Sequence, residues 1–396
     1  MPGESPLSMM RTGPQRPRAA APRRRLWPFY TVAIVILLAI GWSWLWYYAA
    51  SIADRALSGW IAREAAIGRV YACGTQSIGG FPFSIVSRCT EAAARFNTTQ
   101  PPFDVRAGDV TFSAQVFRPT LLNGDITGPV TLADPGQPPT FVATWSHAEL
   151  SLLGLPPDPE GVFVTLAQPR LDRHSGPGAG MLFQADRVEF DGRIVQGSAR
   201  NNPVIEAVGH FTAATAPQLH PLLAEPLNGD IDAVLRGFKD FNPKPWRQLF
   251  REMQASGGGI EIRSLRIERP DAVVLAAGTV TVNDHGKLDG QMNVTVAGLD
   301  NIIPLLGIDQ LIAQGVDRFT GGSGSSAQGF NALDRLVPGL GGVVRQSTNS
   351  SVVDNIKKMG EPTELDTKPA VILPLRINDG VIFLGLIPVG VVPALF

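Results

Sequence analysis

Charged side chains are scarce in this sequence of 396 residues. They make up 17% of the chain, against about a quarter in a typical globular domain. The formal net charge is −1 at pH 7, so the chain lacks the basic excess by which proteins attract nucleic acids. The sequence therefore gives no reason to expect a nucleic-acid partner.

The sequence also lacks the motifs that carry enzyme chemistry. It contains no H-E-x-x-H metal motif, no phosphate-binding P-loop and no G-x-S-x-G nucleophile motif. The glycines at 176, 178 and 180 lack the spacing of a dinucleotide loop. With two cysteines, a structural zinc site would fall short of its usual four ligands. The histidines are scattered and form no paired spacing: His147, His174, His210, His220 and His285. We expect no enzyme activity, no cofactor and no metal.

One long uncharged run is present near the N-terminus. Residues 26–50 carry no charged side chain, and about 20 apolar residues suffice for a helix to cross a bilayer. Tryptophan and tyrosine gather at both ends of the run, as they do at membrane interfaces. Six arginines precede it, which places the N-terminus in the cytoplasm by the positive-inside rule. A cleaved signal peptide is the alternative, with Ala49, Ser51 and Ala53 as a loose cleavage site.

The rest of the chain alternates apolar and polar residues with the period of strands. Four such runs lie at residues 110–116, 162–166, 231–235 and 292–296. Helical spacing is confined to a few places, namely 51–68, 246–253, within 300–313 and near 351–359. We predict a mainly β fold: a transmembrane helix followed by an elongated, curved antiparallel sheet with a few covering helices.

The predicted organisation has five parts. They are a disordered basic tail (1–25), a transmembrane helix (26–50), a helical connector (51–68), a first β-rich half (69–220) and a second β-rich half with helices (221–396). Gly/Ser-rich residues 321–326 are predicted to form a flexible loop.

Four dipeptides of the type Asn-Gly or Asp-Gly predict tight hairpin turns, because both central residues of such turns need positive φ. They are Asn123-Gly124, Asn228-Gly229, Asp289-Gly290 and Asp379-Gly380.

The two cysteines, Cys73 and Cys89, are predicted to form a disulfide, since the body would lie in an oxidising compartment. Two unpaired buried thiols are the alternative. Between them, Gly79, Gly80, Phe81, Pro82 and Phe83 predict a rigid tight turn that brings two aromatic rings together.

Some predicted strands are apolar on both faces, in particular Val273–Leu275 and Val371–Leu373. An antiparallel sheet can leave a face in water only if that face is polar. The sequence offers few helices to cover these strands. Either a second sheet or a ligand such as a lipid must therefore cover them.

The sequence resembles a bacterial membrane-anchored family known as domain of unknown function 2125. The residues that carry the resemblance are Tyr71-Ala72-Cys73-Gly74, the turn at 79–83, Arg88-Cys89, and the ending Leu373-Pro374-Leu375-Arg376, Asp379-Gly380, Leu384-Gly385 and Pro388. The family implies a Gram-negative inner membrane with the body in the periplasm, and implies no established activity.

A weaker likeness, at residues 259–267, 278–280, 286–290 and 296–299, is to AsmA-like envelope proteins. Those proteins carry long, curved sheets, and several have proposed roles in moving lipid. The likeness rests on generic strand and turn spacing and so concerns the fold alone.

Three functions remain open on the sequence. The first is an envelope protein that binds or shields a lipid or other amphiphile. The second is a structural or assembly partner of other envelope proteins, without a ligand. The third is an enzyme with dispersed catalytic residues.

Overall fold

The structure is a computed structural model that describes residues 27–99, 101–155, 158–176, 178–241, 244–306, 358, 360–384 and 387–396. The chain divides after Ala49 into an N-terminal unit and a larger unit of residues 50–396, which we call the body. The predictions for residues 1–25, 321–326 and most of 351–359 lie outside the described residues.

The first element is a single helix, α1 (Trp27–Ala66). Pro28 is tolerated because it stands in the first turn, where its missing N–H has no partner in any helix. Gly68 follows the helix with φ +84°, and its N–H donates to the Ala65 carbonyl, as expected of a glycine C-cap. Up to Ala49 the side chains are uncharged, largely apolar and mostly exposed, and the helix is long and apolar enough to cross a membrane. The predicted span and helical connector are thus one helix.

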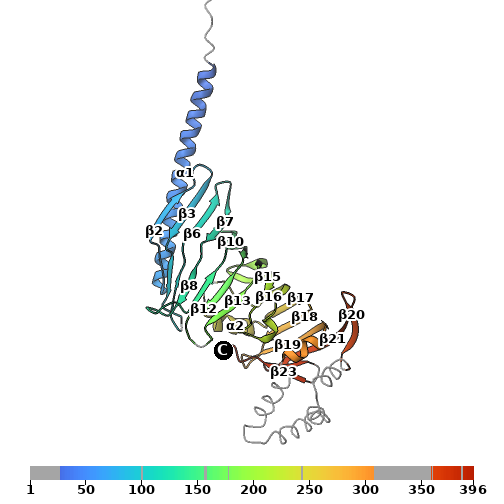
Figure 1. The fold of residues 1–396 in the computed structure, drawn as a ribbon. Helices are drawn as coiled ribbons and strands as arrows, with labels where there is room; N and C mark the ends of the chain where they lie inside the picture. Colours follow the sequence, from blue (N-terminus) through green and yellow to red (C-terminus); the bar gives the residue numbers. More distant parts are fainter. Residues whose placement is uncertain are drawn as a thin grey trace, which may run out of the picture. The chain divides into compact units, whose positions relative to one another are not determined.

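The body is mostly antiparallel β-sheet, which confirms the predicted fold class (Figure 1). A 7-stranded sheet has the order β1 (Arg69–Ala72), β4 (Ala93–Phe96), β5 (Phe103–Arg106), β8 (Val130–Ala133), β9 (Phe141–Thr144), β12 (Arg170–Arg173), β13 (Gly180–Gln184). The 16-stranded sheet begins with β2 (Thr75–Gly79), β3 (Ser84–Thr90), β6 (Val110–Gln115), β7 (Arg118–Ile126), β10 (His147–Leu153), β11 (Gly161–Ala167), β14 (Arg187–Ser198) and β15 (Asn201–Ala214). It continues with β16 (Leu227–Arg236), β17 (Gly259–Glu268), β18 (Val273–Val282), β19 (Leu288–Ala297), β21 (Lys368–Asn378), β22 (Val381–Leu384) and β23 (Ile387–Val391), with β20 (Glu361–Leu365) paired to β21.

The two sheets are joined along a line of breaks in shared long strands. The chain passes from one sheet to the other after only two or three residues, as between β3 and β4 or between β11 and β12. Backbone hydrogen bonds continue through the breaks, for example from the Ala107 N–H to the Ala92 carbonyl and from the Gln168 N–H to the Asp186 carbonyl. The first part of the body is therefore one antiparallel meander, interrupted along a line.

The sheet runs through the predicted boundary at residue 220. Strands β15 and β16 lie on either side of that boundary, and they pair directly from Ile205 opposite Leu235 to Ala214 opposite Leu227. A short 3-10 helix, η1 (Pro221–Leu223), fills the connection. The two predicted halves therefore share one sheet.

Two helices cover parts of this sheet in its second half. In α2 (Trp246–Ala255), Met253 is buried against Phe238 and Val282. In α3 (Leu299–Leu306), Leu299 packs against the cluster that contains Leu373. Both helices were predicted, and the remainder of the second predicted helix, residues 307–313, lies outside the described residues.

Three of the four predicted hairpin turns are wrong. Asn123-Gly124, Asn228-Gly229 and Asp289-Gly290 lie inside β7, β16 and β19. Only Asp379-Gly380 is a turn, joining β21 to β22 with positive φ at both residues. The glycines within strands serve a different purpose, the close approach of a neighbouring group.

Candidate functional site

One face of the 16-stranded sheet is apolar from strand to strand. Residues that oppose one another in an antiparallel ladder share a face. One row of opposed residues runs from β6 to β14 as Phe112, Gly124, Leu150, Val164 and Phe190. From β6 to β22, nearly every paired position on the same face as this row holds an aliphatic, aromatic, methionine or glycine residue.

We call this surface the apolar face. In its first part, from β6 to β14, it consists of Val110, Phe112, Ala114, Leu122, Gly124, Ile126, Ala148, Leu150, Leu152, Val162, Val164, Leu166, Val188, Phe190, Gly192 and Ile194. In its second part, from β15 to β22, it consists of Ile205, Ala207, Gly209, Phe211, Gly229, Ile231, Ala233, Leu235, Ile260, Ile262, Leu265, Ile267, Val274, Ala276, Gly278, Val280, Val282, Leu288, Gly290, Met292, Val294, Val296, Val371, Leu373, Leu375, Ile377, Ile382 and Leu384. The apolar positions of the four alternating runs read from the sequence lie on it, except Val116, which follows the end of β6.

The opposite face of the same strands is mostly polar and carries ion pairs. Arg187 pairs with Glu189 and Arg193 with Asp191, each two residues apart on β14. The hydrogen bond that Arg193 donates to the Asp191 carboxylate raises the pKa of Arg193 above its ordinary value. The sheet is thus amphipathic, with one apolar face and one face that is largely suited to water.

Cover over the apolar face differs between its two parts. In the second part, α2, α3 and η1 pack on it, and the buried clusters include Val294, Leu373 and Met253. In the first part, the large side chains from β6 to β11 are only half-buried, and Phe190 on β14 is 41% exposed. Within the described residues, no buried cluster includes a residue of β6, β7, β10 or β11.

The strands predicted to be apolar on both faces are covered only locally. On the second face, Val273 is buried with Ala297 and Ala370, and Leu365 of β20 packs against them. This patch is small, and the neighbouring residues of that face, such as Gln291 and Asn293, are polar. The packing partner found on this patch among the described residues, Leu365, belongs to β20 of the same sheet and not to a second sheet.

Glycines on the apolar face lie beneath aromatic rings. Phe112 opposes Gly124, and Phe211 opposes Gly229. A Cβ on Gly229 would come within 2.2 Å of the Phe211 ring. Each ring therefore lies across the backbone of the neighbouring strand and does not project away from the sheet. The sequence signal for such a site is a glycine at an apolar position of a strand. The rules for hairpin turns instead interpreted these glycines as turn residues.

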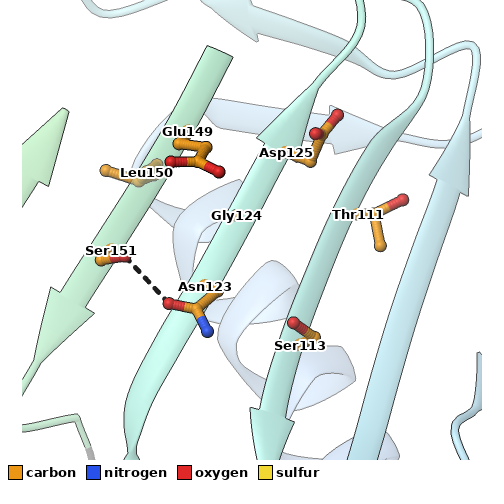
Figure 2. Close-up of a pocket in the computed structure, with 8 residues that line it drawn as sticks. All are labelled: Thr111, Ser113, Asn123, Gly124, Asp125, Glu149, Leu150 and Ser151. Carbon is orange, nitrogen blue, oxygen red and sulfur yellow. Dashed lines mark hydrogen bonds between the residues drawn. The ribbon is translucent and has the colours of Figure 1, made fainter. Parts of the chain in front are cut away.

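The polar face contains an open hollow of about 330 Å³ over β6, β7 and β10. Figure 2 shows Thr111, Ser113, Asn123, Asp125, Glu149 and Ser151 around it. The Ser151 hydroxyl donates to the Asn123 side-chain carbonyl at 2.9 Å. His147 lies beside Glu149, with 3.2 Å between Nε2 and Oε1. No group of three metal-ligating side chains is found in the described part of the chain.

The sequence-predicted site residues lie at the start of the 16-stranded sheet. Cys73 and Cys89 form a disulfide of 2.03 Å, as predicted. Residues 79–83 connect β2 to β3 as a tight turn, with Gly80 at φ +98° and the Ser84 N–H donating to the Gly80 carbonyl. The disulfide thus ties the segment between β1 and β2 to β3.

The body end of α1 contacts the 7-stranded sheet through a chain of aromatic rings. Trp60 of α1 lies 4.8 Å from Tyr71, measured between ring centroids. Tyr71 contacts Phe96, and Phe96 stacks on Phe103. Burial and the neighbouring Glu64 raise the pKa of Tyr71. The sequence predicted a helix at residues 51–68 but did not reveal the ring partners of Trp60.

Comparison with known proteins gives one match. A family model described as an uncharacterized protein conserved in bacteria, DUF2125, matches residues 46–393. No curated protein and no solved structure matches. The matched residues span nearly the whole body together with the last residues of the N-terminal unit. The chain therefore belongs to the DUF2125 family of bacterial proteins.

Proposed function

We propose that this protein is a membrane-anchored envelope protein that holds the acyl chains of a lipid or similar amphiphile on the first part of its apolar face. The observation that carries the proposal is the continuity of that face over β6, β7, β10 and β11 and onto Phe190 of β14, because within the described residues no buried cluster includes a residue of those first four strands. We propose a binding role without catalysis.

The energetics favour an acyl chain as the occupant. Half-buried side chains such as Leu150, Val164 and Phe190 leave apolar surface that water solvates poorly. Each methylene group buried there would contribute about 0.8 kcal/mol. A chain of ordinary length could thus bind without a polar site. Association with other envelope proteins through this surface is the second possibility, and the experiment below distinguishes the two.

We further propose that the body lies in the periplasm and that α1 is a single-pass anchor in the inner membrane. The arginines before residue 26 support a cytoplasmic N-terminus. The disulfide supports an oxidising compartment for the body. An anchor would keep a lipid-binding body beside its lipid source.

Lipid binding can be tested on the full chain purified in detergent micelles with a fluorescent fatty-acyl probe. Leu150→Asp places a charge on the apolar face, whereas Ser151→Asp places the same charge on the polar face of the same strand. We expect Leu150→Asp to lower probe affinity by at least about tenfold, the equivalent of about 1.4 kcal/mol, and Ser151→Asp to leave it unchanged.

Either of two results would contradict lipid binding. The first is an unaltered protein that neither binds the probe nor retains lipid in mass spectra of its extract. The second is an equal loss of affinity in both variants. Oligomers or stable complexes that depend on Leu150, without bound lipid, would support the assembly role instead.

A further inference from the structure

Two neighbouring hairpin tips in the body carry exposed aromatic rings. Phe81 and Phe83 stand in the turn between β2 and β3, and they are 53% and 61% exposed. Phe117, between β6 and β7, is 69% exposed. The Val116 N–H donates to the Phe83 carbonyl at 2.9 Å, and the rings of Phe83 and Phe117 lie 6.3 Å apart. We call these three phenylalanines the aromatic tip.

Contacts within the body show which way the tip points. Later residues of β1 and β2 contact earlier residues of α1, nearer to the start of the body at Ala50. Arg69 pairs with Glu64, Tyr71 contacts Trp60, and the Gln76 amide reaches Asp54 at 3.5 Å. Strands β1 and β2 therefore run antiparallel to the helix, toward Ala50.

The lengths place the tip level with the end of the uncharged run. Four helical residues from Asp54 to Ala50 span about 6 Å. Three strand residues from Gln76 to Gly79 span about 10 Å. The turn that carries Phe81 and Phe83 therefore reaches the level of Ala50, where the uncharged run of residues 26–50 ends.

The charge of these hairpins suits a lipid headgroup region. Residues 75–90 and 110–122 contain no Asp or Glu, and they contain Arg88 and Arg118. Arg118 directly follows Phe117 and is exposed. Aromatic rings beside basic side chains are the composition of segments that lie in membrane interfaces. Exposed apolar patches of this kind commonly mark membrane contacts.

We propose that the aromatic tip enters the interfacial layer of the bilayer in which the chain's own helix is anchored. The inference rests on the membrane anchoring proposed above and is independent of lipid binding by the apolar face. The tip is a second contact that holds β2, β3, β6 and β7, and hence the beginning of the apolar face, against the lipid surface.

The test uses the full chain reconstituted in phosphatidylethanolamine–phosphatidylglycerol nanodiscs. Because Cys73 and Cys89 are joined, a single new cysteine can carry an environment-sensitive fluorophore. Arg118→Cys puts the label beside Phe117 and keeps all three rings. Gln137→Cys is the matched control, since it is exposed in the loop between β8 and β9, at the other end of the strands that begin at Phe117. Nitroxide-labelled lipid is the quencher.

We expect lipid nitroxide to quench the label at 118 several-fold more strongly than the label at 137. Adding Phe83→Asp and Phe117→Asp to the Arg118→Cys chain should reduce that quenching to the level seen at 137. A thiol count of one in each labelled chain before labelling confirms that the disulfide, and with it the hairpin, has formed. Co-flotation with vesicles confirms anchoring by α1.

Two outcomes would overturn the proposal. One is equal quenching at 118 and 137 in a protein that floats with vesicles, which would place the tip in water. The other is strong quenching at 118 that persists in the two aspartate variants, which would show that the rings do not make the contact. Neither outcome bears on acyl-probe binding by the apolar face.

Discussion

At the scale of single residues, glycines and phenylalanines shape the apolar face together. The Phe211 ring occupies the space in which a side chain on Gly229 would stand. The strand is weakened by a glycine, but the ring restores the buried apolar area on the same face. Because Gly229 has no side chain, the apolar face also projects less at that point than it would with a larger residue.

Gly229→Val should therefore destabilise the body. Overpacking of this kind costs about 1–3 kcal/mol, read from chemical denaturation of the full chain in detergent. Gly79→Ala is the control, because a Cβ at Gly79 would meet no atom within 4 Å. Combining Gly229→Val with Phe211→Ala should cost less than the sum of the two single changes. Additive costs would show that the ring does not occupy this space.

The hairpin turn at Asp379 is expected to lose stability in acid. A hydrogen bond from Lys287 holds the pKa of Asp379 below its ordinary value of 3.8. A carboxyl whose pKa is lower in the folded chain than in the unfolded chain stabilises the fold at pH values above its unfolded-state pKa. This contribution is lost as the pH falls through its folded-state pKa. Thermal unfolding should find Asp379→Asn less stable than the unaltered chain at neutral pH, with the gap closing below pH 3.8. A gap that is constant with pH would contradict this.

At the scale of elements, the sequence predicted the strands that form the candidate site and the face on which their apolar residues lie, but not the order of the strands. Alternation at residues such as Val110, Phe112 and Ala114 identified strands and the face that each strand turns inward, because the period of two is intrinsic to the pleat. The order of strands was beyond reach, since non-local pairing leaves no mark in one sequence. The turn prediction failed at Asn123-Gly124. An Asn-Gly pair looks the same in the sequence whether its glycine makes room for a neighbouring ring or adopts the positive φ of a turn.

Helix α2 stabilises the covered part of the sheet and does not belong to the open part. Met253 is 2% exposed and packs against Phe238 and Val282. Met253→Ala should cost about 2–5 kcal/mol in denaturation and leave acyl-probe affinity unchanged. Trp246→Ala is the control on the same helix, with a smaller cost expected from its 53% exposure. Loss of probe affinity at unchanged stability in Met253→Ala would move the binding surface toward α2.

At the scale of the whole molecule, we propose that the body lies outside the cytoplasm. The basic tail and the uncharged run predict this orientation. A phosphatase that is active only in the periplasm, fused after Phe396, should be active. A reporter that is active only in the cytoplasm should be inactive in the same place. The reverse pattern would contradict the proposed topology and deprive the disulfide of its oxidising compartment.

The proposal that the apolar face holds lipid chains can be tested by photo-crosslinking in living bacteria. A photoreactive side chain placed at Leu150 faces the apolar surface, whereas one placed at Ser151 faces the polar surface. After irradiation, intact-mass spectrometry should find lipid-sized adducts at position 150 and none at 151. The same amount of adduct at both positions, or protein adducts alone at position 150, would contradict the claim.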